Sequence, residues 1–343
     1  SESQLQSIET VDLVLMTTDQ LSAILPTMYG KLLTDQIQSL ETSQIAAMTV
    51  NQLAALDAKK LVVIATDRFD SLAIEAVQAL STSQIRGLRS EQLAVLDVEK
   101  IAHLSPTQVA AMRADQVSGL TSDQLAILDD LQLAALGSSQ IAAIETADWQ
   151  KIAPVRVAAL APAQIAWLTS GEDGQIASLT SNQIEAMTPE QVSALNTAQV
   201  ESINTSLISD LSGIQLRALP SASIRALTPE QRDQLLAAQI AELDPLQIAA
   251  FDPSDQFADL SSTQLLALGS LQIAALSTSH LAALDDESLE LFTLQQLSGF
   301  DAKLIRAIND YVFTSVQLPL LSSTQVGWLT SDQFGALGSA EIA

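Results

Sequence analysis

The sequence contains no cysteine, and this absence excludes disulfides and metal sites built on thiolates. Aromatic residues make up only 3% of the 343 residues, and there are two histidines. Basic residues are also few, because 15 Lys and Arg stand against 40 Asp and Glu and give a net charge of −25. A surface with this charge repels nucleic acid phosphates and anionic lipid headgroups. We therefore expect no nucleic acid partner.

Long apolar runs are missing as well. None approaches the roughly 18 residues that a membrane-spanning helix needs, so we expect no membrane insertion. The sequence starts at Ser1 without a secretory signal peptide, which indicates a processed chain or a fragment. There is no Gly-rich phosphate loop, no Ser/His/Asp arrangement and no clustered set of metal ligands. We expect the protein to be no enzyme and to need no cofactor.

What the sequence does contain is an eight-residue repeat, seen as TSDQLAIL from Thr121 to Leu128. We number its positions 1 to 8 from the hydroxyl or acid. Regular octads, 38 in all, fill four stretches: 1–168, 180–251, 261–308 and 322–337. Position 8 is Leu, Ile, Met or Phe in all 38, and position 5 is a large apolar residue in all but one, where Arg232 stands. A fixed period this short indicates a structural module repeated along an axis.

Each octad has the signals of a helix start. Position 1 is Ser, Thr, Asp or Asn in 23 of 38 octads, and these residues cap helix N-termini. Position 4 is Gln in 25 octads, at the spacing of a capping box. Proline is tolerated at the first helical residue, and seven of the ten prolines fall at position 2: Pro26, Pro106, Pro154, Pro162, Pro189, Pro229 and Pro245. Positions 2 to 8 are thus predicted to form about two helical turns.

Two other structures are excluded by the pattern. In one long helix the apolar stripe would advance by roughly 80° per octad, and the Ser/Thr-Pro pairs would interrupt it. A β-solenoid needs alternating, β-branched strands, whereas positions 5 and 8 lie an odd number of residues apart. One octad alone buries too little to be stable, so neighbouring octads must stack. We predict an all-α solenoid, or superhelix, of very short two-turn helices, one per octad, continuous over residues 1–343.

Three segments break the register: 169–179, 252–260 and 309–321. We interpret them as bends or bulges. The first contains Glu172 and Asp173 in an acidic glycine turn, which is either a plain turn or a weak candidate site for calcium. The third contains Tyr311 and is either a local irregularity or a docking surface for a partner.

The rare large side chains are the other candidates for contacts with a partner. Trp167 and Trp328 stand at position 7, which is normally Ala, Ser or Gly. Each could anchor a partner or fill a gap between neighbouring turns. His103 and His280 have no partner at metal-ligand spacing, and we expect both to be surface histidines.

Several phrases carry a resemblance to a known group of proteins. TSDQLAIL, SSQIAAI (residues 138–144) and SLQIAAL (residues 270–276) resemble the tandem "TxxQIAAL" tracts of large secreted proteobacterial surface and adhesin-type proteins. The resemblance covers nearly the whole chain and implies a structural role outside a bacterial cell or at its surface. The haem label that some of these proteins carry transfers no residue, since neither histidine belongs to the repeated motif.

Two functional hypotheses follow. In the first, the protein is a filament subunit, stalk or surface-layer element whose copies assemble head to tail. In the second, it is a binding solenoid or adhesin module that recognises a protein or a glycan. With a net charge of −25, side-by-side packing should be helped by calcium.

Overall fold

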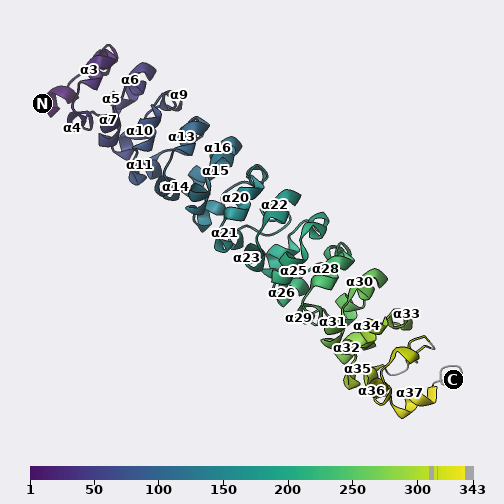
Figure 1. Ribbon diagram of the computed structural model, residues 1–343. Coiled ribbons are helices and arrows are strands. Elements are labelled where there is room, and N and C mark those ends of the chain that lie inside the picture. Colours follow the sequence, from purple (N-terminus) through teal and green to yellow (C-terminus); the bar gives the residue numbers. More distant parts are fainter. Residues whose placement is uncertain (309–312, 315, 337–343) are drawn as a thin grey trace. The chain divides into compact units, whose positions relative to one another are not determined.

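The computed structural model describes residues 1–308, 313–314 and 316–336 (Figure 1). These residues form short helices joined by extended residues, with no β-strand among them, which confirms the predicted all-α solenoid of short helices. None of the described helices is long and apolar enough to cross a membrane.

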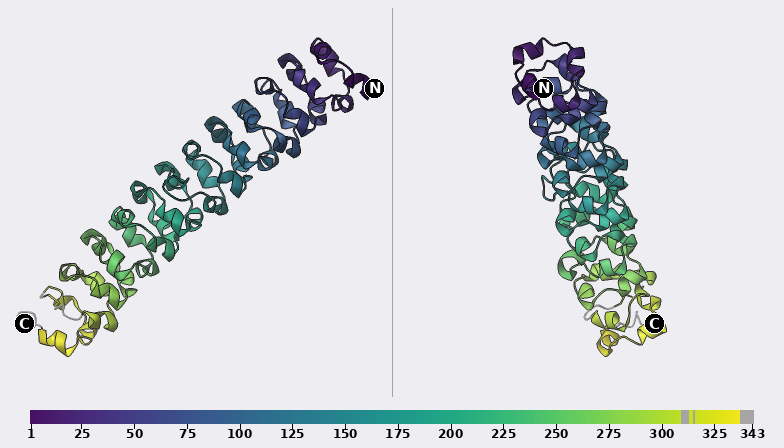
Figure 2. Two further views of the ribbon diagram at one scale, coloured as in Figure 1. Left: turned by 180° about the vertical axis from the view of Figure 1, so that it is seen from behind. Right: turned by 90° about the vertical axis from the view of Figure 1, so that its left-hand side faces the viewer.

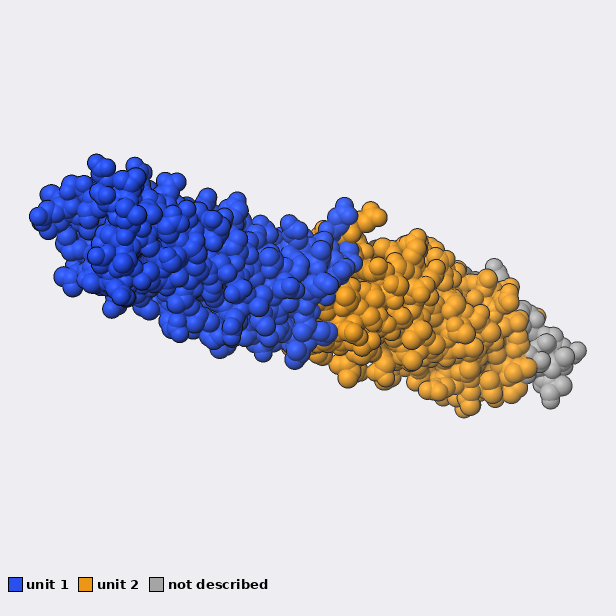
Figure 3. Space-filling model, turned by 90° about the horizontal axis from the view of Figure 1, so that it is seen from above, with its two compact units in different colours: residues 1–169, 173–178 blue, residues 170–172, 179–343 orange. Residues whose placement is uncertain are grey.

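The chain divides into two compact units (Figure 3). Unit 1 comprises Ser1–Thr169 and Asp173–Ser178, and unit 2 comprises Ser170–Glu172 and Leu179–Ala343. The division falls in the register break 169–179. One continuous solenoid over the whole chain stays a prediction.

The helices of unit 1 are α1 Glu2–Gln6, α2 Thr10–Val14, α3 Thr18–Ser22, α4 Pro26–Tyr29, α5 Thr34–Ser39, α6 Thr42–Ala46, α7 Val50–Ala55, α8 Ala58–Leu61, α9 Thr66–Phe69, α10 Ile74–Gln78, α11 Thr82–Gly87, α12 Ser90–Ala94, α13 Val98–Ala102, α14 Pro106–Ala111, α15 Ala114–Ser118, α16 Ser122–Ile127, α17 Asp130–Ala134, α18 Ser138–Ile141, α19 Thr146–Trp149, α20 Pro154–Ala159 and α21 Pro162–Ala166.

The helices of unit 2 are α22 Ser181–Ala186, α23 Pro189–Ser193, α24 Thr197–Glu201, η1 Thr205–Asp210, α25 Gly213–Ala218, α26 Ser221–Arg225, α27 Pro229–Asp233, α28 Ala237–Glu242, α29 Pro245–Ile248, η2 Pro253–Phe257, α30 Ser262–Ala267, α31 Ser270–Ala274, α32 Thr278–Ala282, α33 Asp286–Glu290, α34 Leu294–Leu297, α35 Ala302–Ala307, η3 Leu318–Leu320, α36 Ser323–Val326 and α37 Ser331–Ala336.

The α-helices are shorter than the two turns predicted, with four to six residues each. In the octad of α16 the backbone is already extended at Leu128, with φ −55° and ψ 131°, and stays extended at the N-cap Thr121, with ψ 156°. The chain changes direction after every helix, and the extended residues at positions 8 and 1 make that change. Positions 2 to 8 therefore cannot all be helical.

The predicted helix starts are confirmed. Thr121 Oγ1 accepts from the Gln124 N–H at 3.2 Å, while Gln124 Oε1 accepts from the Thr121 N–H at 2.9 Å. All seven prolines at position 2 are the first residues of their helices. Local capping chemistry thus sets where each helix begins.

Within each unit the helices wind as a coil of stacked turns (Figure 2). In unit 1 the helices from α2 to α20 each pack against a helix three places away along the chain, as α8 does with α11 and α11 with α14. Glutamine side chains reach backbone carbonyls 28 to 31 residues earlier, in the fourth preceding octad. One turn of the coil therefore holds between three and four octads.

The core lies inside this coil, where positions 5 and 8 gather. Leu125 and Leu128 are 0% and 1% exposed. Position 7 lies against position 2 of the octad three places earlier, and a Cβ added at Gly119 would come within 2.7 Å of the Ser90 Cβ. This close approach explains why small residues dominate position 7.

Candidate functional site: the glutamine ladder between turns

The glutamine at position 4 makes two kinds of hydrogen bond at once. In α16 the Oε1 of Gln124 closes the capping box on its own helix. Its Nε2 donates to the carbonyl oxygens of Leu93 and Leu96, at 3.0 and 2.6 Å, in the preceding turn of the coil. The side chain is 1% exposed. Gln124 therefore caps one helix and joins it to the end of another.

The same contact recurs through both units, and we call it the glutamine ladder. Its members each donate from Nε2 to a backbone carbonyl of the preceding turn: Gln36, Gln44, Gln52, Gln84, Gln92, Gln108, Gln116, Gln124, Gln132, Gln140, Gln164 and Gln175 in unit 1, and Gln215, Gln231, Gln239, Gln247, Gln256, Gln264, Gln272, Gln296, Gln317, Gln325 and Gln333 in unit 2.

The ladder requires an acceptor and a donor on one side chain, and the glutamine amide supplies both. Glutamate can close a capping box, but an ionised carboxylate has no N–H or O–H to donate. Placed against two backbone carbonyls in a buried site, it would leave acceptors facing acceptors without water. No Glu stands at position 4 in any of the 38 octads. Glutamate, which capping alone would permit, is therefore absent from position 4.

Basic residues replace glutamine where only the donor is kept. Lys60 Nζ donates to Gly30 O at 2.5 Å, and Arg68 NH1 donates to Leu40 O at 2.5 Å. At Asp148 the donor and acceptor roles are exchanged, because its carboxylate accepts a hydrogen bond from the Ser122 hydroxyl of the preceding turn. Contact between turns is retained although the side chain differs.

His280 replaces glutamine in both of its functions. Its Nδ1 lies 3.0 Å from the Ser277 N–H nitrogen, and its Nε2 lies 3.0 Å from Phe251 O. The side chain is 3% exposed, so the prediction of a surface histidine is wrong for His280. Burial lowers the pKa of His280, and the Phe251 carbonyl and Asp252 oppose that shift. His103 is exposed, as predicted, with its Nδ1 2.7 Å from Glu99 O.

The register breaks keep the ladder. Gln175 still closes on Thr169 N–H at 3.1 Å, although three extra residues lie between cap and glutamine. In 252–260 one extra residue is absorbed by a π-helical turn, η2, and Gln256 Oε1 accepts from the Asp252 N–H at 2.9 Å. Within 309–321, Thr314 and Gln317 form an ordinary octad start, with Gln317 Nε2 on Leu289 O at 2.9 Å. The ladder contact is therefore kept at each of the three breaks.

One bulge accompanies the single charged residue at a core position. Arg232 is 5% exposed, and its NH1 donates to Leu227 O at 3.1 Å. Its NH2 lies 4.0 Å from Asp255 and 3.9 Å from Asp259, both in the break 252–260. The two irregularities are therefore one feature, in which carboxylates of the next turn face the buried guanidinium.

The candidate residues named from the sequence are dispersed. Trp167 is 38% exposed in unit 1, whereas Trp328 is half-buried in unit 2 and its carbonyl accepts from Arg306 Nε at 3.2 Å. Tyr311 lies outside the described residues. Glu172 and Asp173 are both exposed, and no group of three or more metal-binding side chains occurs in the described part of the chain.

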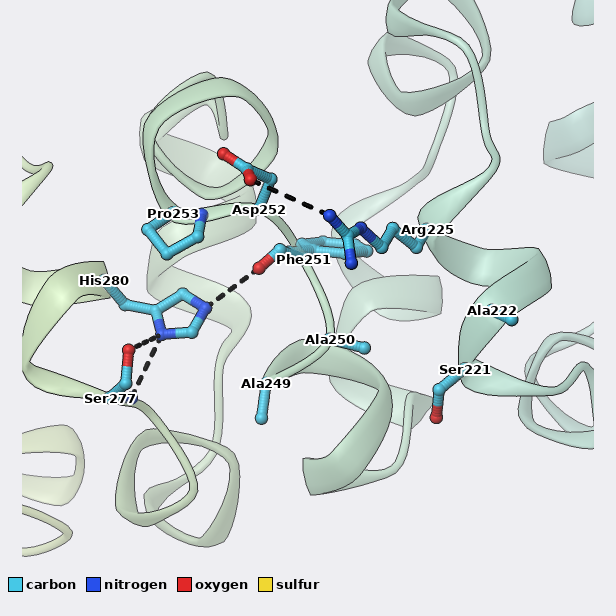
Figure 4. A pocket seen from close by; sticks show the side chains of 10 residues that line it. All are labelled: Ser221, Ala222, Arg225, Ala249, Ala250, Phe251, Asp252, Pro253, Ser277 and His280. Atoms are coloured by element: carbon cyan, nitrogen blue, oxygen red, sulfur yellow. Dashed lines mark hydrogen bonds and ion pairs between the residues drawn. The ribbon is translucent and has the colours of Figure 1, made fainter.

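Unit 2 carries cavities that the sequence did not reveal. Two, of about 410 and 460 Å³, share Arg217, Asp244 and Pro245 as walls. Leu271 lines the first and Leu246 the second, and these side chains are 76% and 75% exposed. A third cavity of about 480 Å³ lies beside His280 (Figure 4). The exposed leucines stand at position 3, usually polar, and that substitution was the available signal.

Comparison with known proteins supports the repeat. Residues 75–106 match a family model described as the ALTTAQ repeat. The match spans 32 residues, the length of four octads, and contains the related phrase ALSTSQ at residues 79–84. The search of curated proteins found no matching relative. The chain is therefore similar to a repeat family over this region.

Proposed function

We propose that the protein is a non-catalytic structural repeat protein, serving outside a bacterial cell as a filament subunit, stalk or surface-layer element. The observation that carries the proposal is the glutamine ladder, in which side chains within each unit donate to backbone carbonyls of the preceding turn of the coil. A stack of this kind can be lengthened without new chemistry. The resemblance to tandem tracts of secreted surface proteins supports the location.

The same chemistry supports head-to-tail assembly of copies of this chain. Gln4 and Gln20 close their capping contacts at 2.9 Å, on Ser1 and Thr17, but among the described residues nothing accepts from either Nε2. In the proposed assembly, backbone carbonyls of a second copy of the chain would accept from Gln4 and Gln20.

The test compares two charge-matched double variants of the 343-residue chain by electron microscopy and analytical ultracentrifugation. Gln4→Glu with Gln20→Glu keeps the capping acceptor and removes the donor, so end-to-end assemblies should be lost. Gln38→Glu with Gln150→Glu adds the same charge at exposed position 6 and should assemble as wild type does. A wild-type protein that stays monomeric at high concentration contradicts the proposal, as does unchanged assembly of the first variant.

A second candidate function is the binding of a basic protein segment along unit 2. The favouring observation is the pair of cavities with Leu246 and Leu271 on their walls, in a chain of net charge −25. Exposed apolar side chains beside acidic residues fit a partner segment that carries both apolar and basic residues. Binding of a basic, leucine-containing peptide should fall in Leu246→Ser with Leu271→Ser. Leu131→Ser with Val155→Ser, equally exposed in unit 1, should leave it unchanged.

A further inference from the structure

His280 is held between two backbone groups that cannot exchange roles. The Ser277 N–H can only donate, and it points at Nδ1; the Phe251 carbonyl can only accept, and it lies at Nε2 (Figure 4). The Ser277 hydroxyl is 2.7 Å from the same Nδ1. These contacts assign the proton of the neutral ring to Nε2 and leave Nδ1 bare. The unprotonated Nδ1 therefore accepts from the cap N–H, as Oε1 does in the ladder glutamines.

The packing leaves the ring little freedom to turn. Phe257 of η2 meets it edge to face, with ring centroids 5.0 Å apart. Side-chain rotation that would carry a protonated Nδ1 away from the Ser277 N–H must also leave the carbonyl of Phe251. Protonation at Nδ1 would thus set two donors, the ring N–H and the Ser277 N–H, against each other. The Ser277 hydroxyl oxygen, 2.7 Å away, can accept from the ring N–H, but the Ser277 backbone N–H then loses its acceptor.

Charged groups around the ring offset the cost of protonation only in part. Asp252 is the carboxylate that acts on the ring, and it is shared with Arg225 at 4.0 Å. Asp255 of η2 and the following Asp259 lie close to Arg232. Helix α35, which also packs on α32, is accompanied by three charged residues that form no hydrogen bond or ion pair with the ring among the described residues: Asp301, Lys303 and Arg306.

We propose that His280 is an acid-sensitive latch between turns of unit 2, which opens when Nδ1 is protonated and releases the N-terminus of α32. Ladder glutamines have no group that titrates in this range, so opening is confined to the octad 277–284. The latch gives an otherwise uniform stack one place that responds to mild acid, independently of how copies assemble.

The direction of the pH effect follows from linkage. Burial lowers the pKa of folded His280 below its ordinary value of 6.5, so the unfolded octad binds the proton more readily. The contribution of the latch to stability is complete above pH 6.5. It is lost as the pH falls from 6.5 towards the folded pKa, at up to about tenfold in the opening equilibrium per pH unit.

Amide hydrogen exchange of the whole chain at pH 7.5 and 5.5 tests the proposal, with rates expressed as protection factors. In wild type, protection of 277–284 should fall in acid, by up to about tenfold. His280→Gln, which restores the ladder residue, should abolish the fall, and His103→Gln should not. Equal loss of protection in His280→Gln, or no loss in wild type, would overturn the proposal.

A second measurement does not depend on any variant. Histidine-selective NMR of the wild-type protein should show His280 as the Nε2–H tautomer at pH 8 and protonation of its ring only below the ordinary value of 6.5. An Nδ1–H tautomer, or titration of His280 at or above its ordinary pKa, would refute the latch.

Discussion

Residues 105–144 of unit 1 and residues 228–284 of unit 2 use the same octad in different ways. The first stretch has glutamine at position 4 of all five octads. The second contains a buried arginine, a π-helical bulge and a histidine in the ladder. Both stretches keep their turns in contact. The comparison shows that the coil depends on contacts between turns, whereas the residue that supplies them can change when its neighbours compensate.

Removing a donor from the regular stretch should have the largest effect. Gln124→Glu places a carboxylate against the carbonyls of Leu93 and Leu96 in a buried site and should cost at least about 3 kcal/mol of unfolding free energy at pH 7. Gln124→Met, which only removes hydrogen bonds, should cost about 1–3 kcal/mol. Urea unfolding of both variants measures the difference.

The acid behaviour of Gln124→Glu sharpens this test. Its buried carboxyl has a raised pKa, so the folded state takes up a proton first and stability relative to wild type recovers as the pH falls. A protonated carboxyl regains one O–H donor. If the Glu and Met variants are equally stable at pH 7, the donor role of the ladder is wrong.

In the irregular stretch a substitution towards the octad pattern should have a smaller effect of opposite sign. Arg232→Leu restores an apolar position 5 and should leave stability unchanged or raise it by about 1 kcal/mol, because a buried ion pair often contributes less than good packing. Thermal unfolding of the variant checks this. Asp255→Asn with Asp259→Asn should destabilise wild type and have no effect in Arg232→Leu. If the stability changes of these substitutions are additive, Arg232 and the two carboxylates of the bulge do not interact.

The sequence predicted what short-range chemistry determines. Caps such as Thr121, prolines at the first helical residue and the apolar core positions all act within eight residues, and each is found as predicted. The second hydrogen bond of Gln124 was missed because its acceptors are backbone carbonyls 28 and 31 residues away, which have no side-chain signature. The burial of His280 was missed for the same reason, because its Nε2 contacts the backbone carbonyl of Phe251, 29 residues earlier.

The number of octads in a turn was also hidden, since it depends on how helices pack and not on any single residue. Once the turn is known to hold between three and four octads, Arg232 and the break 252–260 are seen to lie about one turn apart. Their pairing could then be read from the sequence. The surroundings of Trp167 and Trp328 could not be predicted from the sequence in this way. The contacts of a large side chain at position 7 depend on the local space between turns.

The smallest effect should come from completing the ladder in unit 1. Lys60 already donates to Gly30 O at 2.5 Å, but it has no acceptor for the N–H of its cap, Asp57. Lys60→Gln would keep the donor and add the acceptor, so we expect a gain of about 0.5 kcal/mol. The 3.9 Å ion pair with Asp57 is lost, but Asp57 is 61% exposed and the pair contributes little.

Thermal unfolding should show a higher melting temperature for Lys60→Gln than for wild type. Lys59→Gln, an exposed substitution with the same charge change, should melt at or below the temperature of wild type. If both variants shift equally, net charge explains the change; a gain confined to Lys60→Gln means that one side chain with both an acceptor and a donor stabilises the turn more than a cation does.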